Sequence, residues 1–359
     1  MRIACFVSPH GMGHAARTAA ILGALHDRHP DLETDLYTLV PAHFFAESRI
    51  GPFTYHALRT DLGMVQKNPL EEDVAATVAE LDRFLPFDEA RVAPLANALR
   101  ARGCRAVLCD IAPLGLAVAS RAGIPSVLIE NFTWDWIYAG YTHQDARLQP
   151  FVEQMRAAFA QADHHLQTAP VCLPASSAFQ AGVVSRRPRT PRGEIRLHLG
   201  LPPNTQLVLL TGSLIGAQSP ALARLREASE CTFLLVGGQA PAHRSGNTII
   251  LPTTSEYYHP DLVHACDLVV GKLGYSTLAE VYHAGVPFAY LTRPQFPESQ
   301  KLEAFVRQEM PCLHVIHDEL ASGRWVEALP KALHLPRRPH STPNGADTIA
   351  EWLLARVLR

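Results

Sequence analysis

The sequence predicts an α/β protein made of two domains with parallel sheets, and three observations carry this prediction. Short apolar runs, each long enough for one buried strand, alternate along the chain with longer stretches of helical periodicity. Several runs end at a glycine turn or a charged residue, as parallel strands do where an α/β sheet binds its ligand. A proline- and arginine-rich stretch, residues 170–195, separates two such regions and predicts an interdomain linker.

Length and composition are typical of a large globular protein. The chain has 359 residues, 47% hydrophobic and 18% charged, which is enough for about two packed domains. The formal net charge of −2 predicts no bulk attraction to nucleic acid or to an anionic membrane surface. The N-terminal stretch does not read as a signal peptide, and no apolar run approaches the roughly 20 residues of a membrane span.

The cysteines and histidines indicate neither a disulfide framework nor a metal site. Seven cysteines are scattered, odd in number and free of CxxC pairs, which is the usage of a reducing cytoplasm. The 18 histidines form no HExxH or comparable ligand set. We therefore expect a cytoplasmic protein without a bound metal and without a cofactor.

The first predicted strand, residues 3–7, ends at the turn SPHGMGH, and an alanine-rich helix follows over 15–26. The glycines of this turn, including Gly13, permit backbone conformations that are closed to other residues. His14 can therefore project from the turn into a cleft, although a histidine bonded to the backbone at a helix start is the ordinary alternative. His10 is either a second cleft residue or a simple loop histidine.

Further strands and helices of the first domain follow in order. Strands are predicted over 36–40, 106–109 and 126–129, and helices over 91–102, 114–122 and 147–161. Asp110 follows the strand 106–109, so it lies at the same sheet edge as His14 if the strands are parallel. Both side chains should then face one cleft.

The stretch NFTWDWIYAGY, residues 131–141, is the most distinctive in this domain. Trp134, Asp135 and Trp136 offer two aromatic rings and a carboxylate, which together suit a carbohydrate platform. Aromatic side chains also bury large areas wherever a long loop packs onto a domain. The sequence leaves both interpretations open.

The second domain is predicted to begin with a strand over 207–210 and the glycine-rich loop 211–216. Strands over 233–236 and 248–251 follow, each ending near glycine or proline. A final helix is predicted over 347–358.

The most informative stretch of the second domain runs from Asp267 to Gln300. It contains a strand (268–270), the glycine turn GKLG, a helix ending at Gly285, and a strand (288–291) that leads to a polar loop. Ser276 or Thr277 is the predicted helix N-cap. Such a unit places both of its loops at one edge of a parallel sheet.

The chemistry of this edge suits a nucleoside diphosphate. Backbone N–H groups at the helix start form an anion site, and Lys272 adds a full charge beside it. Glu280 is placed to accept hydrogen bonds from ribose hydroxyls, and Glu298 and Gln300 from sugar hydroxyls. An ordinary strand–helix–strand unit with a solvated lysine and glutamate is the alternative.

This stretch resembles the donor-binding signature of GT-B glycosyltransferases, the group that contains plant UDP-glycosyltransferases and the bacterial peptidoglycan GlcNAc transferase. In that signature a basic or histidine residue, a glycine, a hydroxyl residue and a glutamate follow a strand, before a G-x-P step. The matching positions here are Lys272, Gly274, Ser276, Glu280 and Gly285 to Pro287. The Asp-Gln pair that ends the signature is replaced by Pro297-Glu298-Ser299-Gln300.

A second resemblance spans nearly the whole chain. Residues 131–141 are similar to the NFSWDFIYAEY segment in the glycosyltransferase-like N-terminal portion of plant L-arabinokinases. The likeness extends to SPHGMGHAAR (8–17), to GKLGYSTLAE (271–280), to the pattern of Arg293, Phe296 and Glu298, and to NGAD (344–347). The chain has no room for a separate sugar-kinase half, so we expect no kinase activity.

These resemblances imply the GT-B fold, in which two Rossmann-like domains face each other across a cleft. They also imply an inverting, metal-independent transfer of a sugar from a UDP-linked donor to an acceptor hydroxyl. They imply that His14 is the general base and that Asp110 orients it. The implied donor-binding residues are Gly212, Ser213, Lys272, Gly274, Ser276, Thr277, Glu280, Glu298 and Gln300. The implied acceptor-side residues are His10, Gly13, Trp134, Asp135 and Trp136.

The same resemblances imply a domain organisation. Residues 1–169 would form the acceptor-side domain, 170–195 the linker, 196–343 the nucleotide-sugar-binding domain, and 344–359 a helix that packs back on the first domain. The partners would be small molecules, a nucleotide sugar and an acceptor, with no nucleic acid and no integral membrane segment.

Two other functions are compatible with the sequence. Nucleotide-sugar 2-epimerases share the fold, and they would epimerise the sugar nucleotide without any acceptor. A non-catalytic protein would bind a nucleotide sugar without releasing nucleoside diphosphate, an alternative supported by the altered Asp-Gln pair. Fold alone does not decide among these activities.

Overall fold

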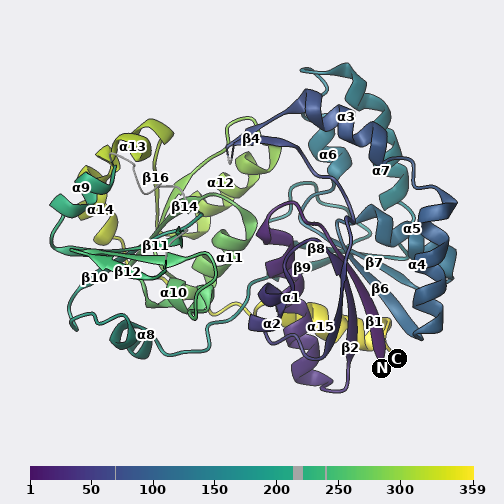
Figure 1. The fold of residues 1–359 in the computed structure, drawn as a ribbon, viewed down its shortest axis with the longest axis horizontal. Coiled ribbons are helices and arrows are strands. Elements are labelled where there is room, and N and C mark those ends of the chain that lie inside the picture. The colour runs from purple at the N-terminus through teal and green to yellow at the C-terminus, as the bar shows by residue number, and fades with distance from the viewer. Residues whose placement is uncertain (69, 213–220, 239–240) are drawn as a thin grey trace. The chain divides into compact units, whose positions relative to one another are not determined.

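The computed structural model describes residues 1–68, 70–212, 221–238 and 241–359, and the chain divides into two compact units (Figure 1). Unit 1 comprises Met1–Arg186, Gln295–Lys301 and Thr342–Arg359. Unit 2 comprises Arg187–Pro294 and Leu302–Ser341. Each unit is built around its own sheet, so each is an α/β domain in its own right.

Within the described residues, unit 1 contains a 7-stranded sheet in the order β3-β2-β1-β6-β7-β8-β9. The strands are β1 (Arg2–Val7), β2 (Glu33–Thr38), β3 (Phe53–Ala57), β6 (Cys104–Asp110), β7 (Ser126–Glu130), β8 (His164–Ala169) and β9 (Phe179–Val183). Neighbouring strands are parallel throughout, so their carboxyl ends lie at one edge.

Helices cover both faces of this sheet, and each face has its own core (Figure 1). Ala4 and Phe6 of β1 join one core, whereas Ile3 and Cys5 join the other, as the alternation of a strand requires. The first core receives side chains from α3 (Val74–Phe84), α4 (Glu89–Ala101), α5 (Pro113–Ala122), α6 (Trp134–Ala139) and α7 (Gln149–Phe159). The second receives them from α1 (Met12–Arg28), α2 (Ala42–Glu47) and α15 (Gly345–Arg356).

A short antiparallel hairpin and a 3-10 turn complete unit 1. The hairpin pairs β4 (Gln66–Asn68) with β5 (Glu71–Glu72) and leads directly into α3. The Asp73 side chain caps α3 by accepting from Ala76 N at 2.9 Å. The 3-10 turn, η1 (Ala146–Leu148), precedes α7.

Unit 2 contains a second 7-stranded sheet, in the order β12-β13-β11-β10-β14-β15-β16 among the described residues. The strands are β10 (Gln206–Leu210), β11 (Cys231–Gly238), β12 (His243–Ser245), β13 (Thr248–Pro252), β14 (Leu268–Lys272), β15 (Phe288–Leu291) and β16 (Cys312–His314). The edge strand β12 pairs antiparallel with β13, and the other pairs are parallel.

Two groups of helices surround the sheet of unit 2. Leu225, Leu320 and Trp325 cover a core that contains Val208 and Phe233. These side chains come from α9 (Ala221–Glu227), α13 (His317–Ser322) and η2 (Arg324–Ala328), with α14 (Leu329–Leu333) beside them. The remaining helices are α8 (Arg192–His198), α10 (His259–Ala265), α11 (Tyr275–Ala284) and α12 (Pro297–Glu309), and α12 begins in unit 1 with residues 297–301.

Two local predictions differ from the structure. Helix α11 starts at Tyr275 with Gly274 as its N-cap, two residues or more before the predicted Ser276 or Thr277. A glycine at the N-cap adopts the extended conformation without steric cost, so no hydroxyl side chain is required there. The helix does end at Gly285, which has the predicted left-handed conformation with φ of 64°.

The second difference concerns the proline-rich stretch 170–195. It contains β9, which adds a parallel edge strand to the sheet of unit 1, and unit 1 extends to Arg186. The strand β9, FQAGV, is short and lies in a stretch rich in proline and arginine, which is why the stretch as a whole has the composition of a linker. Strand pairing with β8 compensates for this weak local signal.

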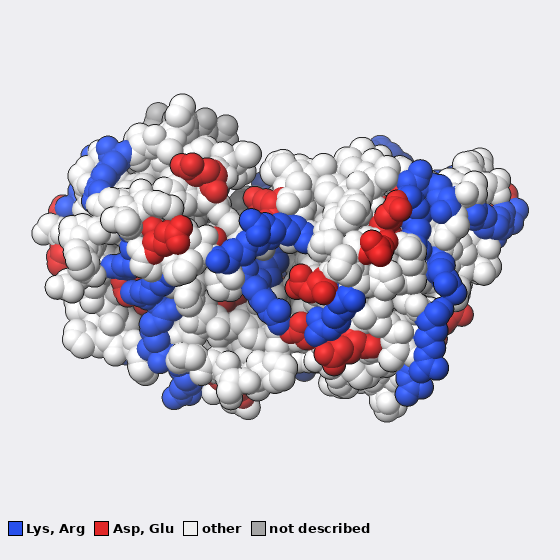
Figure 2. Space-filling model, turned by 90° about the horizontal axis from the view of Figure 1, so that it is seen from below, with Lys and Arg blue, Asp and Glu red and all other residues white. Residues whose placement is uncertain are grey.

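The surface agrees with the nearly neutral composition. On the face drawn in Figure 2, basic and acidic side chains lie close to one another and most of the surface is uncharged. Within the described ranges, no helix is both long enough and apolar enough to cross a membrane.

Candidate functional site

The centre of the candidate site is a histidine–aspartate pair at the carboxyl edge of the unit 1 sheet. His14 lies in the first turn of α1, which Gly11 starts with φ of 78°, and Asp110 is the last residue of β6. His14 Nδ1 lies 2.9 Å from Asp110 Oδ1. The two residues that the sequence places at one sheet edge are therefore in direct contact.

The charge of Asp110 determines which nitrogen of His14 carries the proton. Burial alone would raise the pKa of Asp110, but the adjacent Arg17 and the hydrogen bond from His14 overcome this and hold it below the usual range. An ionised carboxylate can only accept hydrogen bonds, so Nδ1 of a neutral His14 donates and Nε2 keeps its lone pair. The lone pair of Nε2 is then available to accept a hydrogen bond or a proton.

Arg17 is a third residue of this site, beside His14 and Asp110, and it makes several hydrogen bonds there. Its Nε donates to Asp110 Oδ2 at 2.8 Å and its Nη2 to Asp110 Oδ1 at 2.6 Å. Thr18 adds a hydroxyl contact of 3.2 Å to Oδ2. Arg17 is 1% exposed, so its charge is compensated by these partners and not by water.

Arg17 also joins the pair to a residue far along the chain. Its Nη1 donates to Asn131 Oδ1 at 2.6 Å, and Asn131 Nδ2 donates to Glu298 Oε1 at 2.8 Å. Asn131 is fully buried and Glu298 is 5% exposed. The predicted sugar-binding residue Glu298 therefore belongs to unit 1, as does the exposed Gln300.

The aromatic stretch forms α6 and packs against the same loop. Trp134 is completely buried, its Nε1 donates to Asp61 Oδ2 at 2.8 Å, and its ring lies 5.0 Å from that of His10. Asp135 lies 3.6 Å from Arg156, and Trp136 is partly buried against the core. The burial of Trp134 favours the packing interpretation over a carbohydrate platform, because a buried ring presents no face to a ligand.

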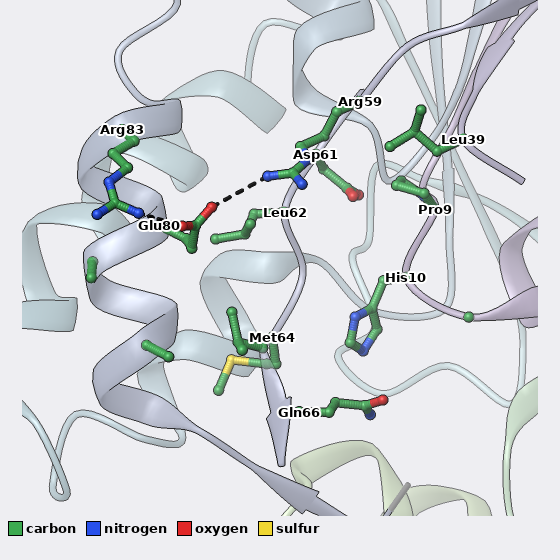
Figure 3. A pocket seen from close by; sticks show the side chains of 14 residues that line it. Pro9, His10, Leu39, Arg59, Asp61, Leu62, Met64, Gln66, Glu80 and Arg83 are labelled. Atoms are coloured by element: carbon green, nitrogen blue, oxygen red, sulfur yellow. Dashed lines mark hydrogen bonds and ion pairs between the residues drawn. The ribbon is translucent and has the colours of Figure 1, made fainter. Parts of the chain in front are cut away.

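A cavity of about 730 Å³ opens beside this loop (Figure 3). The backbone of the turn contributes Pro9 and Gly11 to its wall, and Gly63 lies directly behind His10, where a Cβ would come within 2.5 Å of the ring. The lining residues are Pro9, His10, Gly11, Leu39, Arg59, Asp61, Leu62, Met64, Val65, Gln66, Ala76, Ala79, Glu80 and Arg83. Such a volume is typical of small-molecule sites.

Asp61 is the most unusual residue of this cavity. Burial raises the pKa of its carboxyl to about 6, although the nearby Ser8 hydroxyl and the Trp134 indole partly offset the effect. Its Oδ1 is buried and accepts no hydrogen bond from the described part of the chain. At the far side of the cavity, Arg59 and Arg83 both contact Glu80 (Figure 3).

Unit 2 brings several of the predicted donor-binding residues together around the start of α11. Lys272 ends β14, Gly274 is the N-cap of α11, and Ser276 and Thr277 lie in the first turn of the helix. Gly271 must be a glycine, because a Cβ there would lie 2.5 Å from Thr211 Oγ1 at the end of β10. Gly212 follows with φ of 77°, whereas Ser213 lies outside the described residues.

Glu280 is less accessible than the sequence suggests. It is 4% exposed, and its Oε2 lies 2.8 Å from Nδ1 of His259 at the start of α10. The histidine fixes the carboxylate on the inner side of α11. His259 was not identified from the sequence, because it lies 21 residues before Glu280 in a different helix.

Three further residues escaped the sequence analysis, namely Arg17, Asn131 and Asp61. A signal for Arg17 was present, since it is three residues after His14 on one face of an alanine-rich helix. Asp61 could have been found from its position shortly after β3, by the argument that identified Asp110. Among the described residues, the candidate site included, no group of three or more His, Cys, Asp or Glu side chains is arranged to hold a metal ion.

Comparisons with known proteins were made for sequence and structure. No family model matches the chain. The chain is 28% identical over 373 residues to L-arabinokinase of Arabidopsis thaliana, a match that covers 98% of the chain and 34% of that protein. The chain thus spans about a third of the length of this curated relative.

Solved structures match over the full length of both units. UGT71G1 of Medicago truncatula, complexed with UDP-glucose, matches with a TM-score of 0.63 and 12% identity over 100% of this chain and 98% of its own. Spinosyn forosaminyltransferase SpnP matches with a TM-score of 0.61 and 13% identity over 100% of both chains. MurG of Acinetobacter baumannii matches with a TM-score of 0.55 and 13% identity over 99% of both chains.

These structural neighbours are GT-B glycosyltransferases, which confirms the resemblance found in the sequence. The two Rossmann-like domains, each with a largely parallel sheet, agree with the predicted fold class. The chain therefore has the GT-B glycosyltransferase fold.

Proposed function

We propose that this protein is an inverting, metal-independent glycosyltransferase that moves a hexosyl or pentosyl group from a UDP-linked donor to an acceptor hydroxyl. The observation that carries the proposal is the buried contact between His14 and Asp110, in a chain with the GT-B fold. A general base oriented by a carboxylate is what direct displacement at an anomeric carbon requires.

The geometry supports one sequence of events. His14 Nε2 takes the proton of the acceptor hydroxyl while the hydroxyl oxygen forms its bond to the anomeric carbon. The bond between that carbon and the diphosphate breaks at the same time, and UDP leaves with the electron pair. Asp110 stabilises the imidazolium that forms, and Arg17 keeps Asp110 ionised throughout.

The cavity beside His10 is the proposed acceptor site. Leu39, Leu62 and Met64 offer it an apolar wall, and Asp61 offers a buried oxygen in need of a donor. An unsatisfied carboxylate oxygen costs free energy, and a hydroxyl group on the acceptor would recover part of that cost. An acceptor with an apolar body and more than one hydroxyl group fits this lining best.

The start of α11 is the proposed site for the donor diphosphate. Lys272 and the N–H groups that follow Gly274 supply positive charge and hydrogen-bond donors, and Gly212 follows β10 with a positive φ. UGT71G1, solved with UDP-glucose, supports a UDP-linked donor. Glu280, held by His259, is assigned to the ribose, and Glu298 with Gln300 to the sugar.

The test is a screen of UDP-sugars with amphipathic alcohols and polyols as acceptors, with UDP release and product configuration as the readouts. We expect UDP release only when an acceptor is present, and NMR coupling constants that show inversion at the anomeric carbon. A product with retained configuration would contradict the mechanism. Epimerised sugar nucleotide without acceptor would indicate an epimerase, and donor binding without UDP release would indicate a binding protein.

A further inference from the structure

The Arg17 guanidinium contacts both Asp110 and Asn131. Nε and Nη2 face the two oxygens of Asp110, while Nη1 faces Asn131 Oδ1 at 2.6 Å and Thr168 Oγ1 at 3.4 Å. A guanidinium has five donors in a rigid plane, so the positions of these partners are fixed relative to one another. A lysine ammonium has its donors on a single nitrogen, so it could not reproduce the contacts that three separate nitrogens of Arg17 make with Asp110 and Asn131.

The contact with Arg17 also fixes the orientation of the Asn131 amide. Arginine only donates, so the oxygen of the amide must face it and the nitrogen must face away. That nitrogen donates to Glu298 Oε1 at 2.8 Å, which suits a carboxylate. The Glu298 carboxylate is thus connected to His14 through Asn131, Arg17 and Asp110 by hydrogen bonds no longer than 2.9 Å.

The segment that contains Glu298, residues 295–301, also packs against other residues of unit 1. The chain leaves unit 2 after Pro294 and returns to it at Leu302, so Gln295–Lys301 is a short excursion into unit 1. Phe296 is buried, with its ring 6.2 Å from that of Phe132. Pro297 packs so closely on Gly140 that a Cβ there would lie 2.5 Å from Pro297 Cγ.

We propose that Arg17 and Asn131 are positioning residues that set the Glu298 carboxylate and the His14 imidazole in a fixed relation. Arg17 holds Asp110 against His14 on one side and, through Asn131, the Glu298 segment on the other. The roles of His14 as base and of Glu298 as sugar-binding group rest on the proposed function. The physical connection between them rests on the contacts alone.

The experiment exchanges the donor and the acceptor of the hydrogen bond between Asn131 and Glu298. Asn131→Asp keeps the oxygen that faces Arg17 but replaces the donating nitrogen with an oxygen, which repels Glu298. Adding Glu298→Gln supplies a donor again, with the direction of the hydrogen bond reversed. Asn344→Asp is the matched control, because the Asn344 amide is also buried in unit 1 and donates to Ser185 O at 2.8 Å.

The primary readout is amide hydrogen exchange in the peptide 295–301 of the full chain, which reports local opening. We expect Asn131→Asp to accelerate this exchange by about tenfold or more, and the double variant to return it to within about threefold of the parent. The Asn344→Asp control should leave it unchanged. Unchanged exchange in Asn131→Asp, or a double variant as fast as the single one, would overturn the proposal.

The Arg17 end is tested with Arg17→Lys, which keeps the charge opposite Asp110. It should accelerate exchange in 295–301 and also shift or broaden the NMR signal of the His14 Nδ1 proton, whereas Asn131→Asp should preserve that signal. An Arg17→Lys variant with parent values for both readouts would refute the role of Arg17. If these results hold but the parent transfers no sugar, the proposed function fails and the positioning network stands.

Discussion

Arg17 and Asp110 form a two-point contact, with Nε 2.8 Å from Oδ2 and Nη2 2.6 Å from Oδ1, and neither side chain is more than 2% exposed. Removing one partner of such a pair leaves the other charge buried and uncompensated. The stability of unit 1 and the orientation of His14 therefore depend on the same guanidinium.

Arg17→Met should lower the free energy of unfolding by about 3–5 kcal/mol. Arg28→Met is a matched control on the same helix, because Arg28 contacts Asp347 and Glu351 at the partly exposed surface. This control should cost about 0–1 kcal/mol. Urea denaturation measures the free energy of unfolding of both variants. An equal loss in the two variants would show that the buried Arg17–Asp110 pair stabilises the protein no more than the surface contacts of Arg28 do.

Asp61 should make stability depend on pH in a particular direction. Its folded pKa of about 6 lies above the ordinary value of 3.8, so between these values the folded state binds more protons than the unfolded state. The carboxyl group therefore contributes stability below pH 4 that is lost as pH rises through 6. Asp61→Asn removes this titration without changing the shape of the side chain.

The stability of the parent relative to Asp61→Asn should accordingly fall by roughly 2 kcal/mol between pH 4 and pH 7. The measurement is urea unfolding of the two proteins at unit steps of pH. A difference that stays constant, or that grows with pH, would mean that Asp61 is not buried as the structure places it.

The cavity can be filled without touching the histidine–aspartate pair. Ala76 lines the cavity from α3, whereas the adjacent Ala75 is exposed and is not part of the lining. Ala76→Trp should reduce kcat/KM for the acceptor by about tenfold to a hundredfold with little change in donor affinity. Ala75→Trp should leave both unchanged. If the two variants behave alike, the acceptor binds elsewhere.

Lys272 should distinguish a diphosphate from a nucleoside. Lys272→Ala is expected to weaken UDP binding by about tenfold or more, and uridine binding by less than about twofold, because the lost interaction is with the phosphates. Calorimetric titration of both ligands gives the comparison, with Lys331→Ala as a control in the same unit. An equal loss for both ligands would assign Lys272 a structural role.

The sequence predicted those parts of the molecule that depend on local pattern. Alternating apolar runs located most strands of both sheets, and Gly285 ended its helix where the pattern placed it. The argument about parallel strand ends predicted that His14 and Asp110 face one cleft, and the structure adds that their side chains are in direct contact. The strand β9 is short and lies in a stretch rich in proline and arginine, so the local pattern predicted a linker there.

Contacts between residues far apart in the sequence could not be predicted from local sequence pattern. Asn131 and Glu298 are separated by 167 positions, and their hydrogen bond forms only because residues 295–301 join unit 1. The contact of His259 with Glu280 likewise depends on how α10 packs against α11. Trp134 could be read either as a ligand platform or as core, and only its complete burial distinguishes the two.

The central claim is that His14 takes a proton from an acceptor hydroxyl, and turnover of the His14→Ala variant tests it most directly. With a saturating acceptor, His14→Ala should reduce kcat by about 10²–10⁴ with little change in donor affinity, and Asp110→Asn should act in the same direction. His10→Ala, the neighbouring histidine of the same turn, should have a smaller effect. Near-parent turnover in His14→Ala would contradict the proposed mechanism.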